Sequence, residues 1–217
     1  MNTSVYRFKF DVKHCRGALL AISAFALGGH FVTASAASLQ VSVLDQTGAP
    51  VPDAIVYATP VSGKLPPAKA GTAIIDQIKR KFVPKVSVVQ TGTAIKFPNK
   101  DNFEHDVYSF SPAKRFELNL YHGVPAKPVV FDKPGLVVMG CNIHDSMVAY
   151  LLVVDTPWFA KTDHNGQATI ENVPPDNYRV TAWHHRLADV NGLPVQATAV
   201  RDDTKASFRL TLSADPD

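Results

Sequence analysis

Four side chains that could bind a soft metal ion occur in a suggestive order along the chain. Segment 141–147 reads Cys-Asn-Ile-His-Asp-Ser-Met, so it brings the thiol of Cys141, the imidazole of His144 and the thioether of Met147 close together. His105 lies 36 residues upstream of the cysteine, beside a β-type run, and folding could bring its imidazole to the same point. A thiolate, two imidazoles and a weak thioether suit copper cycling between two oxidation states. The spacing therefore predicts one mononuclear copper site at these four residues.

Each of the four residues has a plainer interpretation when it is taken alone. A lone cysteine is typically a small buried hydrophobe, and a methionine before an apolar strand is typically a core side chain. A strand histidine is more often a hydrogen-bonded core residue than a ligand. Zinc is the main competing metal, but it usually gathers more thiolates or a carboxylate and has little use for a thioether. The order of the four residues and their spacing favour copper.

Short β-type runs surround these residues and must position them. Seven runs between residues 74 and 154 alternate with turns rich in Gly and Pro, which is typical of a β-sandwich or barrel. The run 136–140 leads into the Cys-His-Met loop and the run 148–154 leads out of it. The last run is apolar throughout, which predicts a central strand covered on both faces. The aromatic residues Phe103, Tyr108 and Phe110 are expected in the core.

Further short motifs accompany the candidate ligands along the region 82–154. In chain order they are Phe82-Val83-Pro84, the segment 92–99 (Gly-Thr-Ala-Ile-Lys-Phe-Pro-Asn), His105, Pro134-Gly135 and the Cys-x-x-His-x-x-Met loop. In this order the region resembles the cupredoxins, the fold family of blue copper proteins. Its short ligand loop is most similar to that of amicyanin within the amicyanin- and plastocyanin-like cupredoxins. The whole chain also resembles bacterial proteins labelled methylamine utilization protein, although that label alone predicts no role in methylamine metabolism.

The resemblance implies a role for each candidate ligand. Cys141 is the strong thiolate ligand, His105 and His144 are the equatorial imidazoles, and Met147 is the axial ligand of a type 1 copper site. The chain departs from many family members at Asp106, where Asn or Ser is common. Because that position helps to brace the ligand loop, we expect the hydrogen bonds around the site and its reduction potential to differ.

The flanking segments carry motifs of their own: Gly48-Ala49-Pro50-Val51 and Asp53-Ala54 within 41–58, and Asp163-His164-Asn165-Gly166 within 162–180. On these motifs, residues 38–60 resemble the opening of a carboxypeptidase regulatory-like, transthyretin-type β-sandwich, and residues 155–212 resemble its second half, with Asn177 where a glycine is usual. The predicted fold is therefore all-β: a Greek-key cupredoxin sandwich at 74–154, inserted into a second small β-sandwich. The rival arrangement is an N-terminal hairpin packed on the cupredoxin, with a separate C-terminal sandwich. Contacts between Val41 or Val43 and residues 168–183 would favour insertion.

Residues 1–36 have the order of a secretory signal peptide. A basic segment precedes the apolar run 18–27, and Ala34-Ser35-Ala36 predicts cleavage after Ala36. We therefore expect a signal helix and a periplasmic protein. The apolar run is shorter than the roughly 20 residues that span a bilayer, so an uncleaved leader is the alternative and would be the only membrane contact. Because Cys15 leaves with the leader, Cys141 is the only thiol of the mature chain.

Charge and motifs exclude several other classes of function. The formal charge of +3 comes from the leader, and the remaining chain has 18 basic and 18 acidic residues, so nucleic-acid binding is not expected. The sequence has no phosphate-binding glycine loop, nucleophile-elbow serine or zinc-binding helix motif, so no enzyme is expected. The triplet 79–81 (Lys-Arg-Lys) reads as a solvated turn more than as a docking patch.

The other mature histidines are expected to serve as surface or packing residues. They are His122, His164, His184 and His185. The adjacent pair at 184–185 could capture a metal ion, but neighbouring side chains on a strand point to opposite faces.

The leading functional hypothesis is an exported single-electron carrier. A rigid β-scaffold would hold copper with little ligand movement, and a transient redox partner protein would approach the edge of His144 and apolar neighbours such as Ile143. Two other classes stay open: a copper carrier or sensor without redox exchange, and an interaction module in which copper is structural.

Overall fold

The structure is a computed structural model that describes residues 37–125, 127–189 and 192–214. The predicted signal peptide and its helix, residues 1–36, lie outside the described residues. All the regular elements in the described ranges are β-strands, which confirms the all-β class. Across these same ranges, no helix is long and apolar enough to span a membrane.

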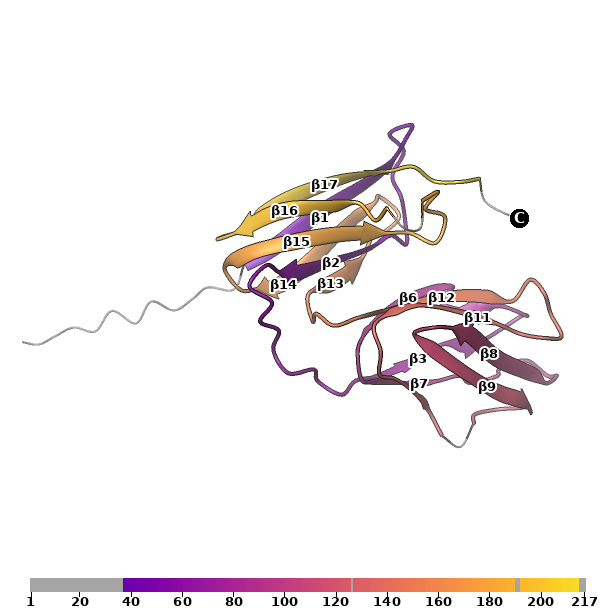
Figure 1. Cartoon of the computed structure of the whole chain (residues 1–217). Helices are drawn as coiled ribbons and strands as arrows, with labels where there is room; N and C mark the ends of the chain where they lie inside the picture. Colours follow the sequence, from indigo (N-terminus) through magenta and orange to yellow (C-terminus); the bar gives the residue numbers. More distant parts are fainter. Residues whose placement is uncertain (1–36, 126, 190–191, 215–217) are drawn as a thin grey trace, which may run out of the picture. The chain divides into compact units, whose positions relative to one another are not determined.

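Strands from the two flanking segments share two sheets (Figure 1). One sheet has the order β14-β1-β17 and the other the order β13-β2-β15-β16. Val41 lies opposite Ala168 on β14 and Ala206 on β17, which is the kind of contact expected to favour insertion. The strands are β1 (Ala37–Asp45), β2 (Ile55–Pro60), β13 (Phe159–Lys161), β14 (Gln167–Val173), β15 (Asp176–Trp183), β16 (Val195–Val200) and β17 (Thr204–Leu210).

The intervening residues form a second sandwich. Its main sheet has the order β6-β12-β11-β8-β9, its second sheet the order β10-β7-β3, and β4 pairs with β5. β12 lies between β6 and β11 with its last four residues buried, which confirms the predicted central strand. The strands are β3 (Thr72–Ile74), β4 (Asp76–Gln77), β5 (Phe82–Val83), β6 (Val86–Gln90), β7 (Thr93–Lys96), β8 (His105–Ser111), β9 (Lys114–Tyr121), β10 (Val129–Phe131), β11 (Gly135–Gly140) and β12 (Val148–Val154).

Each pair of sheets encloses its own apolar core. In the flanking sandwich, Leu39 and Val41 of β1 share a buried cluster with Val180 of β15. In the second sandwich, Ile95 of β7 and Leu151 of β12 belong to another buried cluster, which also contains Cys141 and Met147. Apolar residues at alternate positions of a strand share one face, and burying that face against a facing sheet yields these sandwiches.

Phe110 is a correction to the predicted core. Its side chain is 74% exposed, whereas Val107 and Ser109 of the same strand are buried. Successive residues of a strand point to opposite faces, so residues 108 and 110 face away from the core that receives residues 107 and 109. Tyr108 is half-buried and lies with its ring centroid 5.2 Å from that of Phe110.

The Asn165-Gly166 turn connects the two sheets of the flanking sandwich. Gly166 has a φ of +69°, and its N–H donates to the carbonyl of Asp163 at 3.0 Å, so a tight turn is present. However, β13 before the turn pairs with β2, and β14 after it pairs with β1. The turn therefore carries the chain from one sheet to the other and does not close a hairpin.

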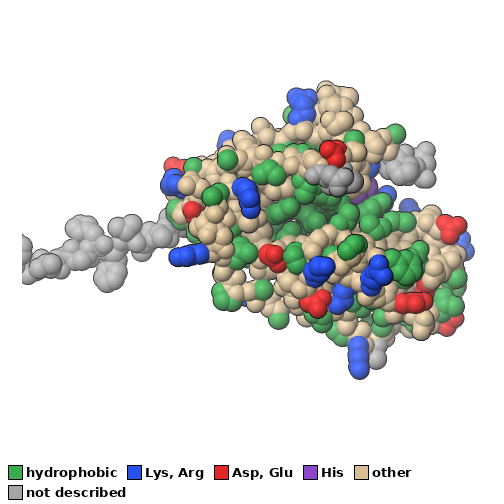
Figure 2. All heavy atoms as spheres, viewed as in Figure 1, with side chains coloured by type: hydrophobic (Ala, Val, Ile, Leu, Met, Phe, Trp, Pro, Cys, Tyr) green, Lys and Arg blue, Asp and Glu red, His purple; other side chains and the backbone are tan. Residues whose placement is uncertain are grey.

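Charged side chains are intermixed on the visible face. Figure 2 shows Lys and Arg side chains scattered among Asp and Glu side chains and not gathered by sign.

Candidate metal centre

Three of the four predicted ligands converge at one end of the second sandwich. The Sγ atom of Cys141 lies 3.8 Å from Nδ1 of His105 and 4.0 Å from Nδ1 of His144. One ligand atom from each of the three residues lies within 4.8 Å of the others. The two imidazole centroids are 5.0 Å apart, with an angle of 65° between the ring planes. The residue that is distant in sequence thus reaches the loop.

Sheet topology explains this convergence. β8 begins at His105, and the neighbouring antiparallel strand β11 ends at Gly140, immediately before Cys141. In an antiparallel pair, the start of one strand and the end of the other lie at the same edge, so both ligands meet there. A Cβ atom at Gly140 would lie only 2.8 Å from the ring of Tyr108, so a larger residue here would have to displace the end of that side chain.

The separations fit a common metal ion. Atoms bound at about 2.0–2.3 Å to one ion, with three ligands around it in a plane, lie about 3.5–4 Å from one another. The two measured Sγ–Nδ1 separations fall within this range. The cluster contains one thiol, two imidazoles and no carboxylate. This donor set suits copper better than structural zinc, which typically has four protein ligands.

Met147 lies at the end of the ligand loop. Its N–H donates to the carbonyl of His144 at 2.9 Å and closes the loop into a turn just before β12. Its side chain is buried in the same apolar cluster as Cys141. Met147 thus lies in the apolar core that also contains Cys141. Its role as axial ligand stays a prediction.

Burial distinguishes the ligands from one another. His105 and Cys141 are buried, whereas His144 is half-buried and its neighbour Ile143 is 49% exposed. Burial raises the pKa of the Cys141 thiol, and hydrogen bonding to Asp106 raises it further, so the metal-free site holds a protonated thiol. A cation that binds there must displace that proton. The half-buried imidazole is the ligand nearest to solvent.

Asp106 braces the ligand loop, as its position predicted. Its Oδ1 accepts a hydrogen bond from the backbone N–H of Asn142 at 2.8 Å, and its Oδ2 accepts one from the Asn142 side-chain amide. The carboxylate thus accepts two bonds from the residue that follows the cysteine. These bonds hold the ligand loop to β8.

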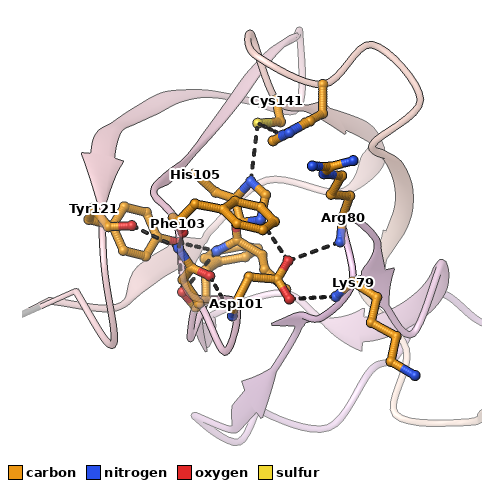
Figure 3. Close-up of polar contacts among 11 residues, drawn as sticks. Lys79, Arg80, Asp101, Phe103, His105, Tyr121 and Cys141 are labelled. Carbon is orange, nitrogen blue, oxygen red and sulfur yellow. Dashed lines mark hydrogen bonds and ion pairs between the residues drawn. The ribbon is translucent and has the colours of Figure 1, made fainter.

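A second carboxylate contacts the site from the other side of His105. Figure 3 shows Asp101 between the His105 ring and the turn that carries Lys79 and Arg80. Asp101 Oδ2 lies 2.8 Å from His105 Nε2, the nitrogen that faces away from Cys141. The carboxylate also accepts the backbone N–H groups of Lys79 at 2.6 Å and Arg80 at 2.9 Å. Burial would raise the pKa of Asp101, but hydrogen bonds from Arg80, His105 and Lys79 outweigh it and lower the pKa.

Aromatic and amide side chains complete the surroundings. The ring of Phe103 lies 5.0 Å from that of His105 and 5.7 Å from that of His144, and the Arg80 guanidinium lies 5.2 Å from the Phe103 centroid. Asn99 donates to the carbonyls of Phe103 and Tyr121 and accepts the Asp101 N–H at 3.0 Å. The loop between β7 and β8 is therefore fixed on both sides of Asp101.

Sequence reasoning did not identify Asp101 or the contact made by Phe103. Both lie in an irregular loop where no periodicity distinguishes a side chain that faces the site from one that faces solvent. The usable signal was a carboxylate four residues before a candidate histidine ligand, since ligand histidines commonly donate their second N–H to such a group.

The remaining histidines lie elsewhere. His122 and His164 are exposed, as expected for surface residues. His184 is buried, and its ring centroid lies 4.3 Å from that of His185, so the two rings do not point to opposite faces. The expectation fails because β15 ends at Trp183 and the pair lies in the turn beyond the strand, where the two-residue alternation no longer applies.

Comparisons with known proteins give partial likenesses. No protein-family model and no curated protein matches the chain. Similar solved structures include a purple cupredoxin from Nitrosopumilus maritimus (19% identity over 37% of this chain and 98% of that chain, TM-score 0.34). They also include a reduced amicyanin variant (19%, 45% and 98%, TM-score 0.35) and a copper-containing nitrite reductase from Thermus scotoductus (24%, 52% and 28%, TM-score 0.35). Because these TM-scores are low, the metal site rests on the geometry of its own residues.

Proposed function

We propose that this chain is an exported type 1 copper protein that carries single electrons in the periplasm, with His105, Cys141, His144 and Met147 as ligands. The observation that carries the proposal is the convergence of one thiol and two imidazole nitrogens within 4.8 Å of one another. When bound there, copper would supply a one-electron couple. The protein's part is to hold the donor atoms, exclude water and present one ligand to a partner.

Several features favour electron transfer over storage or delivery of the ion. His105 starts a strand, Cys141 follows one directly, and Met147 directly precedes one, so sheet edges restrict their movement. Asp106 and Asp101 hold the loop and one imidazole by hydrogen bonds. A site that barely rearranges when its charge changes has a small reorganisation energy. A copper carrier, in contrast, needs ligands that open.

His144 is the proposed point of electron exchange. It is the half-buried ligand, and Ile143 beside it exposes about half of its side chain, 49%. A small apolar surface around a ligand edge suits a short-lived contact with a redox partner, because it can be desolvated and released quickly. The partner is proposed as another periplasmic protein, and no substrate turnover is assigned to this chain.

The domain plan is part of the proposal. A cupredoxin domain at 74–154 would be inserted into a carboxypeptidase regulatory-like sandwich formed by 38–60 and 155–212, and residues 1–36 would be removed on export. The pairing of β1 with β14 and of β2 with β15 supports the insertion. Mass spectrometry of the mature protein from a periplasmic extract should give a chain that begins at Ala37. A mature chain that keeps residues 1–36 would contradict cleavage.

Absorption and paramagnetic-resonance spectra test the proposal. Copper-loaded protein should show an intense thiolate-to-copper charge-transfer band that bleaches reversibly with ascorbate. The band should vanish in Cys141→Ser and in His105→Ala. The exposed His164, outside the site, offers a matched control, so His164→Ala should keep the band. An unchanged spectrum in Cys141→Ser would overturn the assignment, and colourless copper that passes readily to a chelator would indicate a carrier instead.

A further inference from the structure

The contact between Asp101 and His105 constrains which ring nitrogen of His105 faces the other ligands. His105 Nδ1 faces Cys141 Sγ at 3.8 Å, and His105 Nε2 faces Asp101 Oδ2 at 2.8 Å. A carboxylate can only accept at this contact, so the proton of a neutral imidazole must lie on Nε2. The Nδ1 lone pair then faces the sulfur of Cys141. The contact thus selects which nitrogen can bind a metal.

Asp101 is itself held by the backbone of a turn from another part of the sandwich. Its two oxygens accept the backbone N–H groups of Lys79 and Arg80, two residues with φ of 51° and 58° in the turn between β4 and β5. Left-handed backbone at two successive non-glycine residues is unfavourable, and here it directs both N–H groups at one carboxylate. The turn is closed by reciprocal backbone bonds between Ile78 and Lys81 at 2.9 and 3.1 Å. A segment more than 20 residues upstream therefore fixes the carboxylate before any metal binds.

The other carboxylate near the ligands has a different partner. Asp106 directs both oxygens at Asn142, so it braces the loop and leaves the His105 ring nitrogens to Asp101 and the cysteine. The side chain of Asp101 is only 9% exposed, which limits competition by water for the His105 contact. The ring of Phe103 also packs against the same imidazole in an edge-to-face arrangement.

We propose that Asp101 is a positioning residue of the centre: it fixes the Nε2–H tautomer of His105, leaves Nδ1 as the ligand atom and favours the oxidised ion. The effect on the oxidised ion rests on the proposed function. The tautomer of His105, in contrast, is a property of the metal-free chain. A carboxylate that accepts the outer N–H of a ligand histidine raises the basicity of the inner nitrogen. Its negative charge stabilises the more positive oxidation state.

The first test uses metal-free protein labelled with ¹⁵N at histidine. Two-bond proton–nitrogen spectra at alkaline pH report which ring nitrogen carries the proton. We expect pure Nε2–H for His105 in the wild type and a mixture of tautomers in Asp101→Ala. Asp163→Asn is the matched control, because Asp163 also accepts two backbone N–H groups, at 2.9 Å each, but in the other sandwich. It should leave the His105 signals unchanged.

The second test compares copper-loaded wild type, Asp101→Asn and Asp163→Asn. Asp101→Asn preserves size and one acceptor oxygen, so it guards against loss of the fold. Partners of this kind typically change metal affinity about 10- to 100-fold. If the Cu(II)/Cu(I) affinity ratio falls about tenfold, the reduction potential rises by about 59 mV for one electron. Redox titration should show this rise in Asp101→Asn and not in Asp163→Asn.

The outcomes separate the two claims. A His105 tautomer that is Nδ1–H in the wild type, or unchanged in Asp101→Ala, overturns the positioning role whatever the metal. The predicted tautomers in a protein that forms no blue copper site support the positioning role and overturn the proposed function. A blue site whose potential is equal in wild type and Asp101→Asn overturns the effect on the oxidised ion.

Discussion

Replacing Asp106 with alanine should loosen the ligand loop by an amount that the structure allows us to estimate. Asp106 is 4% exposed, and its carboxylate accepts the Asn142 backbone N–H at 2.8 Å as well as the Asn142 side-chain amide. A buried donor left without its partner costs about 1–3 kcal/mol. The Asn142 side chain is exposed and can turn to water, and the desolvation of the carboxylate disappears with the substitution. We therefore expect a net loss of about 1–2 kcal/mol.

Two measurements on metal-free protein test this estimate. Urea unfolding followed by circular dichroism should give the loss in free energy of unfolding. Amide exchange at Asn142 should accelerate by about 5- to 30-fold, the factor that corresponds to 1–2 kcal/mol. Asp106→Asn keeps an acceptor for the backbone N–H and should lose less stability than Asp106→Ala. If Asp106→Ala leaves both the unfolding curve and the Asn142 exchange rate unchanged, the bracing role is refuted.

Three further substitutions test other parts of the structure. Gly166→Ala should destabilise the flanking sandwich by more than about 2 kcal/mol in urea unfolding, because φ is +69° and the new Cβ would collide with a backbone carbonyl of β1. Gly63 also has a positive φ but open space around it, so Gly63→Ala should lose less free energy of unfolding. Equal losses in the two variants would contradict the collision. A hydrogen bond from the Thr47 hydroxyl lowers the pKa of Asp45 below 3.8, so this carboxylate stabilises the fold above pH 3.8, and its contribution is lost as pH falls through the folded-state pKa. The unfolding midpoint of Asp45→Asn should therefore fall less in acid than that of the wild type. An equal fall in both proteins would contradict the role of Asp45. Met147→Leu should keep the blue colour and shift the reduction potential, because an axial thioether is a weak ligand; a colourless variant would show a stronger role.

Much of the fold followed from local patterns. Alternation and apolar runs located the strands that became β1, β2 and β6 to β12, because each buries one face or both. The convergence of His105 with Cys141 and His144 was predictable for the same reason: strand ends hold these residues, and a sheet places those ends together. Strand pairing between β1 and β14 was predicted only through resemblance, since nothing local connects segments more than 120 residues apart.

The parts that escaped prediction depend on irregular backbone. Asp101 acts through a turn at 79–80 whose shape no periodicity reveals, and Phe103 reaches the histidine rings from the same kind of loop. The expectation that His184 and His185 point to opposite faces failed because it applied strand alternation beyond Trp183, where β15 ends. Phe110 shows the opposite case: strict alternation with Val107 and Ser109 places it outside, but its hydrophobic side chain suggested the core.

Anomalous diffraction at the copper edge from crystals of copper-loaded protein tests the central claim most directly. The account predicts one copper ion per chain, bonded to Nδ1 of His105, Sγ of Cys141 and Nδ1 of His144. A copper ion located away from Cys141, or a site in which His105 binds through Nε2, would contradict it.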